Sequence, residues 1–287
     1  MASLREIRRK IKSVKSTQQI TKAMKMVAAS RLRRAQARIL SARPFANKME
    51  EMMRHLLFRV EQDKPHRLFV PGAGTKRALL LMTSDKGLCG GFNANLIRQA
   101  LSYIRQYGIQ NTDLFIVGKK GRDYFTRMRA PVSKEYLDIA NNVSFAHAEI
   151  IAHDLMETFF AGSYAAVDMI YNEFKSVIQQ KIVVKQLLPL VPSPSRGEEV
   201  TYPDYIFEPG KTAILESIIP RFIKAQLYRV LLESAAAELG ARMSAMENAT
   251  NNASDLIGTL TLTLNRTRQA AITKEILEVV SGAEALK

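Results

Sequence analysis

A glycine-rich stretch, TSDKGLCGGFNANL at residues 83–96, is the first place in this chain where residue types and spacing could do chemistry. Its glycines at 87, 90 and 91 follow the apolar run RALLLM, and glycines after a strand can let backbone N–H groups approach a phosphate. A nucleotide-binding loop would add a Gly-Lys-Ser/Thr sequence or the GxGxxG spacing, and neither is present. The pattern therefore favours a turn from a strand to a helix over a phosphate loop.

In such a turn we expect Asn93 or Asn95 near the helix cap, with Asp85 and Lys86 facing solvent or a partner. Ser84 beside Asp85 lacks the G-x-S-x-G context of a nucleophile. The single cysteine excludes an internal disulfide and a cysteine-based metal site, and the four histidines show no spacing typical of metal ligands. We expect no catalytic, cofactor-binding or metal-binding residues.

Positive charge is concentrated at the beginning of the chain. The net charge is +15, and residues 1–49 contribute +13 of it, with 14 Lys or Arg and one acid, Glu6. This placement indicates an acidic partner, which could be nucleic acid, lipid headgroups or an acidic protein loop, although a solvated helix face would also explain it. No stretch approaches the roughly 18 apolar residues that span a bilayer, so we expect a soluble or peripheral protein.

Heptad patterns predict a long helix at each end of the chain. The first pattern begins with Leu4, Ile7, Ile11 and Val14 and resumes from Ala28 to Val60, with Pro44 expected to kink or interrupt the helix near residues 41–42. The second runs without a miss through positions 239, 243, 246, 250, 253, 257, 260 and 264, and an apolar face continues to residue 280. We expect the two helices to pair antiparallel, since a whole domain lies between them, and Pro220 to separate a short entry helix.

The first heptad is broken by polar residues. Its register places Gln18, Thr21 and Lys25 on the seam, while Ile20, Met24 and Val27 form a displaced apolar stripe. Either the coil shifts its register here, or this turn faces something other than the second helix.

The middle of the chain has the alternating pattern of an α/β layer domain. Strands are predicted at 77–82, 112–118, 165–171 and 182–190, with helices near 93–107 and 144–161. Only ten residues separate the last two strands, which favours a hairpin. We therefore expect an N-terminal coiled-coil helix at residues 1–60, an α/β domain at 76–192 and a C-terminal coiled-coil helix at 211–287.

Several segments together resemble one known family. The stretches STQQITKAMKMVAASRLRRAQ, SDKGLCGGFNANL, QLLPL, YIFEPG and YRVLLESAAAELGARMSAMENATNNASDLI are similar, in order and spacing, to the γ subunits of bacterial F-type ATP synthases. The most specific match is the terminal ITKEILEVVSGAEA, and the resemblance covers essentially the whole chain.

The resemblance implies a long antiparallel coiled coil of the two terminal helices plus a Rossmann-like α/β domain. It implies a rotating central shaft, not itself catalytic, that couples ion flow through a membrane c-ring to ATP synthesis or hydrolysis in a ring of three α and three β subunits. The implied partners are α, β, the ε subunit and the c-ring. The implied location is peripheral, at the cytoplasmic face of the bacterial plasma membrane.

Contact roles follow from the same resemblance, position by position. Met24 and Lys25 match positions that meet an acidic lever loop of β. Residues of the C-terminal helix match further β contacts, namely Arg242, Arg268, Gln269 and Thr273. Tyr205 and Glu208 in YIFEPG match the surface that meets the c-ring and ε.

Two other classes of function fit parts of the sequence. A basic helical nucleic-acid-binding protein would explain the charged N-terminus, but it would interleave aromatic residues, and residues 1–44 contain none. A nucleotide-using enzyme would explain the glycines and the α/β core, but catalytic groups are missing.

Overall fold

A computed structural model of the chain describes residues 3–58, 67–140, 142–177, 179–190 and 211–284. The chain divides into two compact units. One, the coil unit, consists of Met1–Ala29 and Arg242–Lys287, and the other, the α/β unit, consists of Ser30–Ala241. In the described residues no helix is both long enough and apolar enough to cross a bilayer.

Two helices make up the coil unit. They are the first part of α1, Leu4–Phe58, and the last part of α5, Lys211–Glu284. A capping box starts α1, because the Ser3 hydroxyl accepts a hydrogen bond from the backbone N–H of Glu6 and the Glu6 carboxylate accepts one from the backbone N–H of Ser3. The buried residues of the unit, including Ile7, Ala28 and Ala253, lie at the predicted heptad positions, which confirms the coiled coil.

Both prolines expected to interrupt the long helices lie inside them. Helix α1 continues through Pro44 and α5 continues through Pro220, so Pro44 does not interrupt α1 and the predicted separate entry helix is wrong. A proline removes one backbone donor, and buried neighbours such as Ile219 and Ile223 hold the surrounding turns in place. Tertiary packing therefore overrides the local preference.

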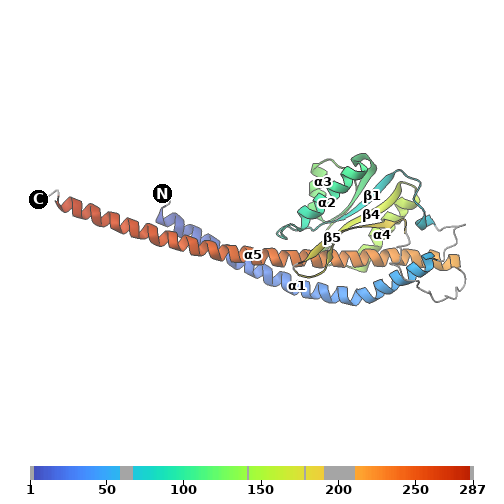
Figure 1. Ribbon diagram of the computed structural model, residues 1–287, viewed down its shortest axis with the longest axis horizontal. Helices are drawn as coiled ribbons and strands as arrows, with labels where there is room; N and C mark the ends of the chain where they lie inside the picture. Colours follow the sequence, from blue (N-terminus) through green and yellow to red (C-terminus); the bar gives the residue numbers. More distant parts are fainter. Residues whose placement is uncertain (1–2, 59–66, 141, 178, 191–210, 285–287) are drawn as a thin grey trace. The chain divides into compact units, whose positions relative to one another are not determined.

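The α/β unit is built on a five-stranded sheet in the order β3-β2-β1-β4-β5 (Figure 1). The first four strands are parallel to one another, and β5 is antiparallel to β4. The strands are β1 Lys76–Met82, β2 Thr112–Val117, β3 Val132–Tyr136, β4 Tyr164–Phe174 and β5 Gln180–Leu188. The connecting elements are α2 Phe92–Tyr107, α3 Lys119–Arg127, α4 Phe145–Phe160 and two short 3-10 turns, η1 Arg67–Phe69 and η2 Ile109–Asn111.

The topology explains where the helices lie in this unit. The β1-to-β2 and β2-to-β3 crossovers run in the same direction and the crossover to β4 runs back, so a constant right-handed sense places α2 and α3 on one face and α4 on the other (Figure 1). The predicted strands, both predicted helices and the β4–β5 hairpin are confirmed. Sequence reasoning missed α3 and the edge strand β3, because α3 is short and contains Gly121, and because the three middle residues of β3 are exposed.

Candidate functional site

The polar residues that break the first heptad form a layer inside the coil unit. Thr21 is buried, and its hydroxyl oxygen lies 2.8 Å from that of Thr250 on α5. One turn further along α1, Lys25 Nζ lies 2.6 Å from Glu247 Oε1. The coil therefore keeps its register through this turn and fills the seam with polar partners.

The displaced apolar stripe consequently lies on the flank of the coil. Ile20 and Val27 are 57% and 54% exposed, and Met24 between them is half-buried. Successive members are four and three residues apart, so they share one side of α1. Exposed apolar side chains aligned on one flank are suited to contact another protein.

A hollow of about 320 Å³ lies beside this layer and is lined only by polar residues of α1 and α5, among them Gln18, Lys22 and Asn251. Lys22 carries a positive charge on the exposed surface next to it. The region thus combines an apolar flank, a cationic surface and a polar seam within two turns of helix.

The predicted contact residues of α5 fall into two environments. Arg242 is half-buried, whereas Arg268, Gln269 and Thr273 are exposed. Within the described part of the chain, none of these three exposed side chains forms a hydrogen bond or an ion pair. Tyr205 and Glu208 lie outside the described residues.

The last turns of α5 extend beyond the start of α1. The helices run antiparallel, and Thr21 lies opposite Thr250. Leu4, the first residue of α1, is seventeen residues before Thr21, so it lies opposite Thr267, which is seventeen residues after Thr250. Beyond Thr267, apolar side chains are exposed on the helix, namely Ile272, Ile276, Leu277, Val279 and Val280. This segment, residues 268–284, is called the α5 tip below.

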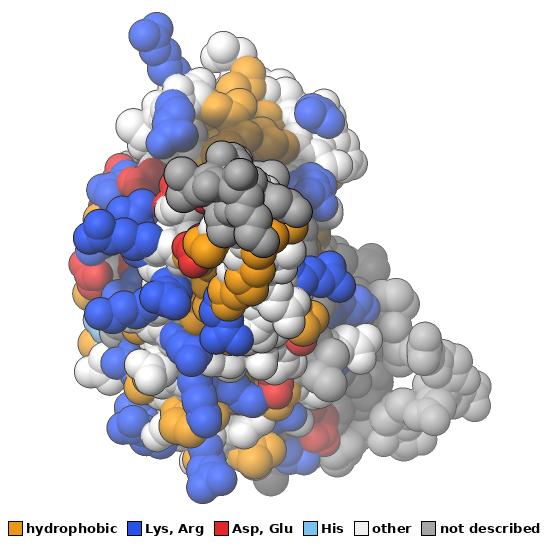
Figure 2. Space-filling view, turned by 90° about the vertical axis from the view of Figure 1, so that its left-hand side faces the viewer, with side chains coloured by type: hydrophobic (Ala, Val, Ile, Leu, Met, Phe, Trp, Pro, Cys, Tyr) orange, Lys and Arg blue, Asp and Glu red, His pale blue; other side chains and the backbone are white. Residues whose placement is uncertain are grey.

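Positive charge dominates the face of the molecule shown in Figure 2. Figure 2 shows Lys and Arg side chains spread over the face in view, with few acidic ones among them. In α1, the cations of the coil unit include Arg5, Arg8, Arg9, Lys12 and Lys15, all exposed. Such a surface attracts acidic partners.

The glycine-rich loop does not form a phosphate cradle. Helix α2 begins after Gly91, so Asn93 and Asn95 lie in its first turn near the cap, as expected, although no side chain caps the helix. The Asn93 side chain accepts a hydrogen bond from the backbone N–H of Ser84 at 2.9 Å and thereby closes the loop on itself.

Asp85 has a structural role that the sequence did not indicate. Its Oδ1 accepts hydrogen bonds from the backbone N–H groups of Lys119 and Asp138, at 3.1 and 3.2 Å. The carboxylate therefore lies at the beginning of α3 and ties together the loops that follow three strands. The expectation that Asp85 faces solvent or a partner is corrected, whereas Lys86 is exposed.

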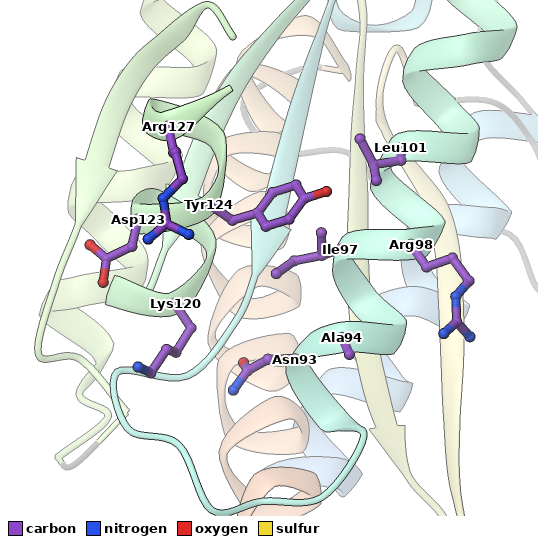
Figure 3. A pocket seen from close by; sticks show the side chains of 9 residues that line it. All are labelled: Asn93, Ala94, Ile97, Arg98, Leu101, Lys120, Asp123, Tyr124 and Arg127. Carbon is purple, nitrogen blue, oxygen red and sulfur yellow. The ribbon is translucent and has the colours of Figure 1, made fainter. Parts of the chain in front are cut away.

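A groove of about 510 Å³ lies between α2 and α3 on the outer face of the sheet (Figure 3). Ile97, Leu101 and Tyr124 form its apolar part, while Lys120 and Arg127 of α3 line it without an ion pair to any described residue. The groove could attract an anionic group. It brings together no nucleophile and base, and no set of three His, Cys, Asp or Glu residues in the described ranges could hold a metal ion.

Comparison with known proteins gives one consistent result. Residues 3–286 match the family model described as ATP synthase. The ATP synthase gamma chain of Anaeromyxobacter sp. (strain Fw109-5) is 47% identical over 295 aligned positions, and the alignment covers 100% of both chains.

Solved structures agree in fold. A chain from the central stalk/c-ring structure of Tetrahymena thermophila mitochondrial ATP synthase is 30% identical, with a TM-score of 0.60, covering 80% of this chain and 99% of that one. A chain from the rotor of Euglena gracilis mitochondrial ATP synthase is 22% identical, with a TM-score of 0.68, covering 94% and 98%. The second similarity concerns the fold alone.

Proposed function

The chain belongs to the ATP synthase gamma chain family, and from this premise we propose that it is the rotating central shaft of an F-type ATP synthase. In this role it couples ion flow through a membrane c-ring to ATP synthesis, or ATP hydrolysis to ion pumping, in an α3β3 ring. Residues 1–60 and 211–287 supply the shaft helices, and residues 76–192 supply an α/β domain.

The observation that carries the proposal is the asymmetry of the coil unit. Its apolar stripe of Ile20, Met24 and Val27 lies on one flank only, and the tip continues as the single helix α5. A rotating coil with unlike sides presents a different surface to each β subunit at any angle. Only such differential contact can bias three otherwise equal nucleotide sites toward different conformations.

In this proposal the chain is a non-catalytic subunit of the enzyme. We place the subunit peripherally, at the cytoplasmic face of the bacterial plasma membrane, with α, β, ε and the c-ring as partners. The nucleic-acid-binding alternative gains no support from the similarities.

The proposed contacts with β lie on the two helices of the coil unit, α1 and α5. The turn that carries Met24 and Lys25 meets an acidic lever loop of β, for which the cationic surface of α1 is complementary in charge. Arg242, Arg268, Gln269 and Thr273 meet β along α5. Tyr205 and Glu208 meet the c-ring and ε.

Reconstitution tests the proposed function. The purified chain is mixed with α and β subunits from the same source, and complex formation is measured together with ATP hydrolysis. We expect a stable complex whose hydrolysis depends on the added chain. A chain that stays apart from α and β, or that hydrolyses ATP alone, would refute the proposal.

A further inference from the structure

The polar layer of the coil unit contains two pairs of side chains that connect α1 to α5. Thr21 and Thr250 face each other through their hydroxyl oxygens at 2.8 Å, and Lys25 and Glu247 form an ion pair at 2.6 Å. Buried apolar residues, Ala28 on α1 and Met246 and Ala253 on α5, lie close to these pairs. Polar groups thus occupy seam positions that apolar residues fill elsewhere in the coil.

A polar layer in a coiled coil can fix the relative position of the helices, because a slip leaves its groups without partners. Glu247 is the only carboxylate of α5 between Glu238 and Asp255. A slip by one helical turn in either direction would therefore leave Lys25 opposite a stretch without an acid. Simple apolar packing of Ala, Met and Ile would distinguish such registers much less.

We propose that the Lys25–Glu247 and Thr21–Thr250 pairs form a register lock that positions the apolar stripe on the shaft. The role of the stripe as a β contact rests on the proposed function. The lock itself does not depend on that function. Lys25 and Glu247 are then positioning residues. They hold Ile20, Met24 and Val27 at one position along the coil axis and at one rotation about that axis relative to α5.

A register lock and a direct contact between Lys25 and β place different requirements on the charge at position 25. The resemblance assigns Lys25 to an acidic surface of β, where its positive charge would be required. In the structure the Lys25 side chain is 37% exposed and the Glu247 side chain is 45% exposed, and their charged groups pair with each other at 2.6 Å. A lock requires opposite charges at the two positions, whichever position carries which sign.

Charge exchange in the full-length chain tests the lock first. Lys25→Glu and Glu247→Lys each place like charges across the seam, and we expect each to lower the thermal midpoint of the helical signal by roughly 2 °C. The double variant Lys25→Glu/Glu247→Lys should recover most of that loss. Lys22→Glu is the matched control, because it makes the same charge change on the same turn without an ion pair to a described residue. Equal losses in the double and single variants would overturn the lock.

The same four variants are then assembled with α, β and the membrane sector, and ion pumping is measured per ATP hydrolysed. We expect Lys25→Glu and Glu247→Lys to lose coupling and the exchanged pair to restore it, with hydrolysis largely retained. If the exchanged pair is as uncoupled as Lys25→Glu although its thermal midpoint is restored, the charge of Lys25 acts directly on a partner and the positioning role is wrong. If the wild-type chain does not assemble at all, the proposed function fails, while the melting data still decide on the lock.

Discussion

Arg43 of α1 and Glu233 of α5 form an ion pair inside the α/β unit, with Nη2 of the arginine 3.1 Å from Oε1 of the glutamate. The Glu233 side chain is only 2% exposed, and its second oxygen accepts a hydrogen bond from the backbone N–H of Phe174 at the end of β4. A single buried carboxylate therefore ties both long helices to the sheet. In the proposed shaft this joint would carry torque between the α/β domain and the helices.

Glu233→Gln tests the stability that this joint contributes. The amide preserves the volume, but it loses the charge and leaves either Arg43 or the Phe174 N–H with a poorer acceptor. We expect the free energy of unfolding to fall by about 1–3 kcal/mol, measured by chemical denaturation. Glu157→Gln, at an exposed carboxylate whose Oε2 lies 3.9 Å from Nε2 of His153, is the control and should change stability by less than about 0.5 kcal/mol. Equal effects of the two substitutions would show that Glu233 contributes no more to stability than an exposed carboxylate does.

Met24→Lys tests the flank of the coil. A cation added to the apolar stripe would strengthen attraction to an acidic β loop and hinder rotation past it, so we expect coupling to fall more than assembly. The measurement is ion pumping per ATP hydrolysed, together with the amount of assembled complex. Met26→Lys is the matched control, since two residues turn the helix by about 200° and place the exposed Met26 on the opposite flank. Unchanged coupling in Met24→Lys would contradict the proposed contact.

Ile276→Gln/Val280→Gln tests the α5 tip. Both side chains are exposed, so the stability of the isolated chain should change by less than about 0.5 kcal/mol. If the tip is a bearing within the α3β3 ring, assembly or chain-dependent ATP hydrolysis should decrease nevertheless. Ile257→Gln provides the contrast, because this half-buried seam residue should destabilise the chain itself. Full activity of the double variant would exclude an apolar contact at the tip.

Tyr171→Phe tests a pH dependence of the α/β unit. Burial, followed by the charge of Glu173, raises the pKa of Tyr171 to about 12. The unfolded chain loses this proton near pH 10 while the folded chain keeps it, so the stabilisation is complete below about pH 10 and is lost as the pH rises toward about 12.

The phenylalanine variant cannot lose this proton. We expect its stability relative to wild type to rise by up to about 1.4 kcal/mol per pH unit above about pH 10. Denaturant unfolding of both proteins at a series of alkaline pH values measures the difference. A constant difference across this range would show that the hydroxyl titrates alike in both states.

Much of the fold was predictable because the patterns are long and regular. The heptad from Leu239 to Leu264 could be read without a miss, and the strands of the α/β unit are apolar runs bounded by turn residues. Elements with weak patterns were missed, as β3 shows, because an exposed edge strand lacks the apolar run that identifies a central one. The interruptions expected at Pro44 and Pro220 do not occur, because packing overrides the local preference of proline.

The candidate site was predictable only in part. The sequence separated the stripe of Ile20, Met24 and Val27 from the seam, but it left open whether the coil shifts its register there. No role was predicted for Glu247. Thr21 and Thr250 occupy seam positions of the two heptad patterns, and this could have indicated a polar layer between antiparallel helices. Asp85 was misplaced, because its partners on α3 and after β3 are distant in the sequence.

By itself the sequence determined the family, the two long helices and the α/β class, because periodicity and residue identity along the chain carry that information. The tertiary structure decided which side of α1 is the seam, which residues of α5 face Thr21 and Lys25, and which residue of α5 lies opposite the start of α1. Those facts depend on pairing between residues more than 200 positions apart, and hydrophobic periodicity predicts that a helix needs a partner without specifying the register of that partner.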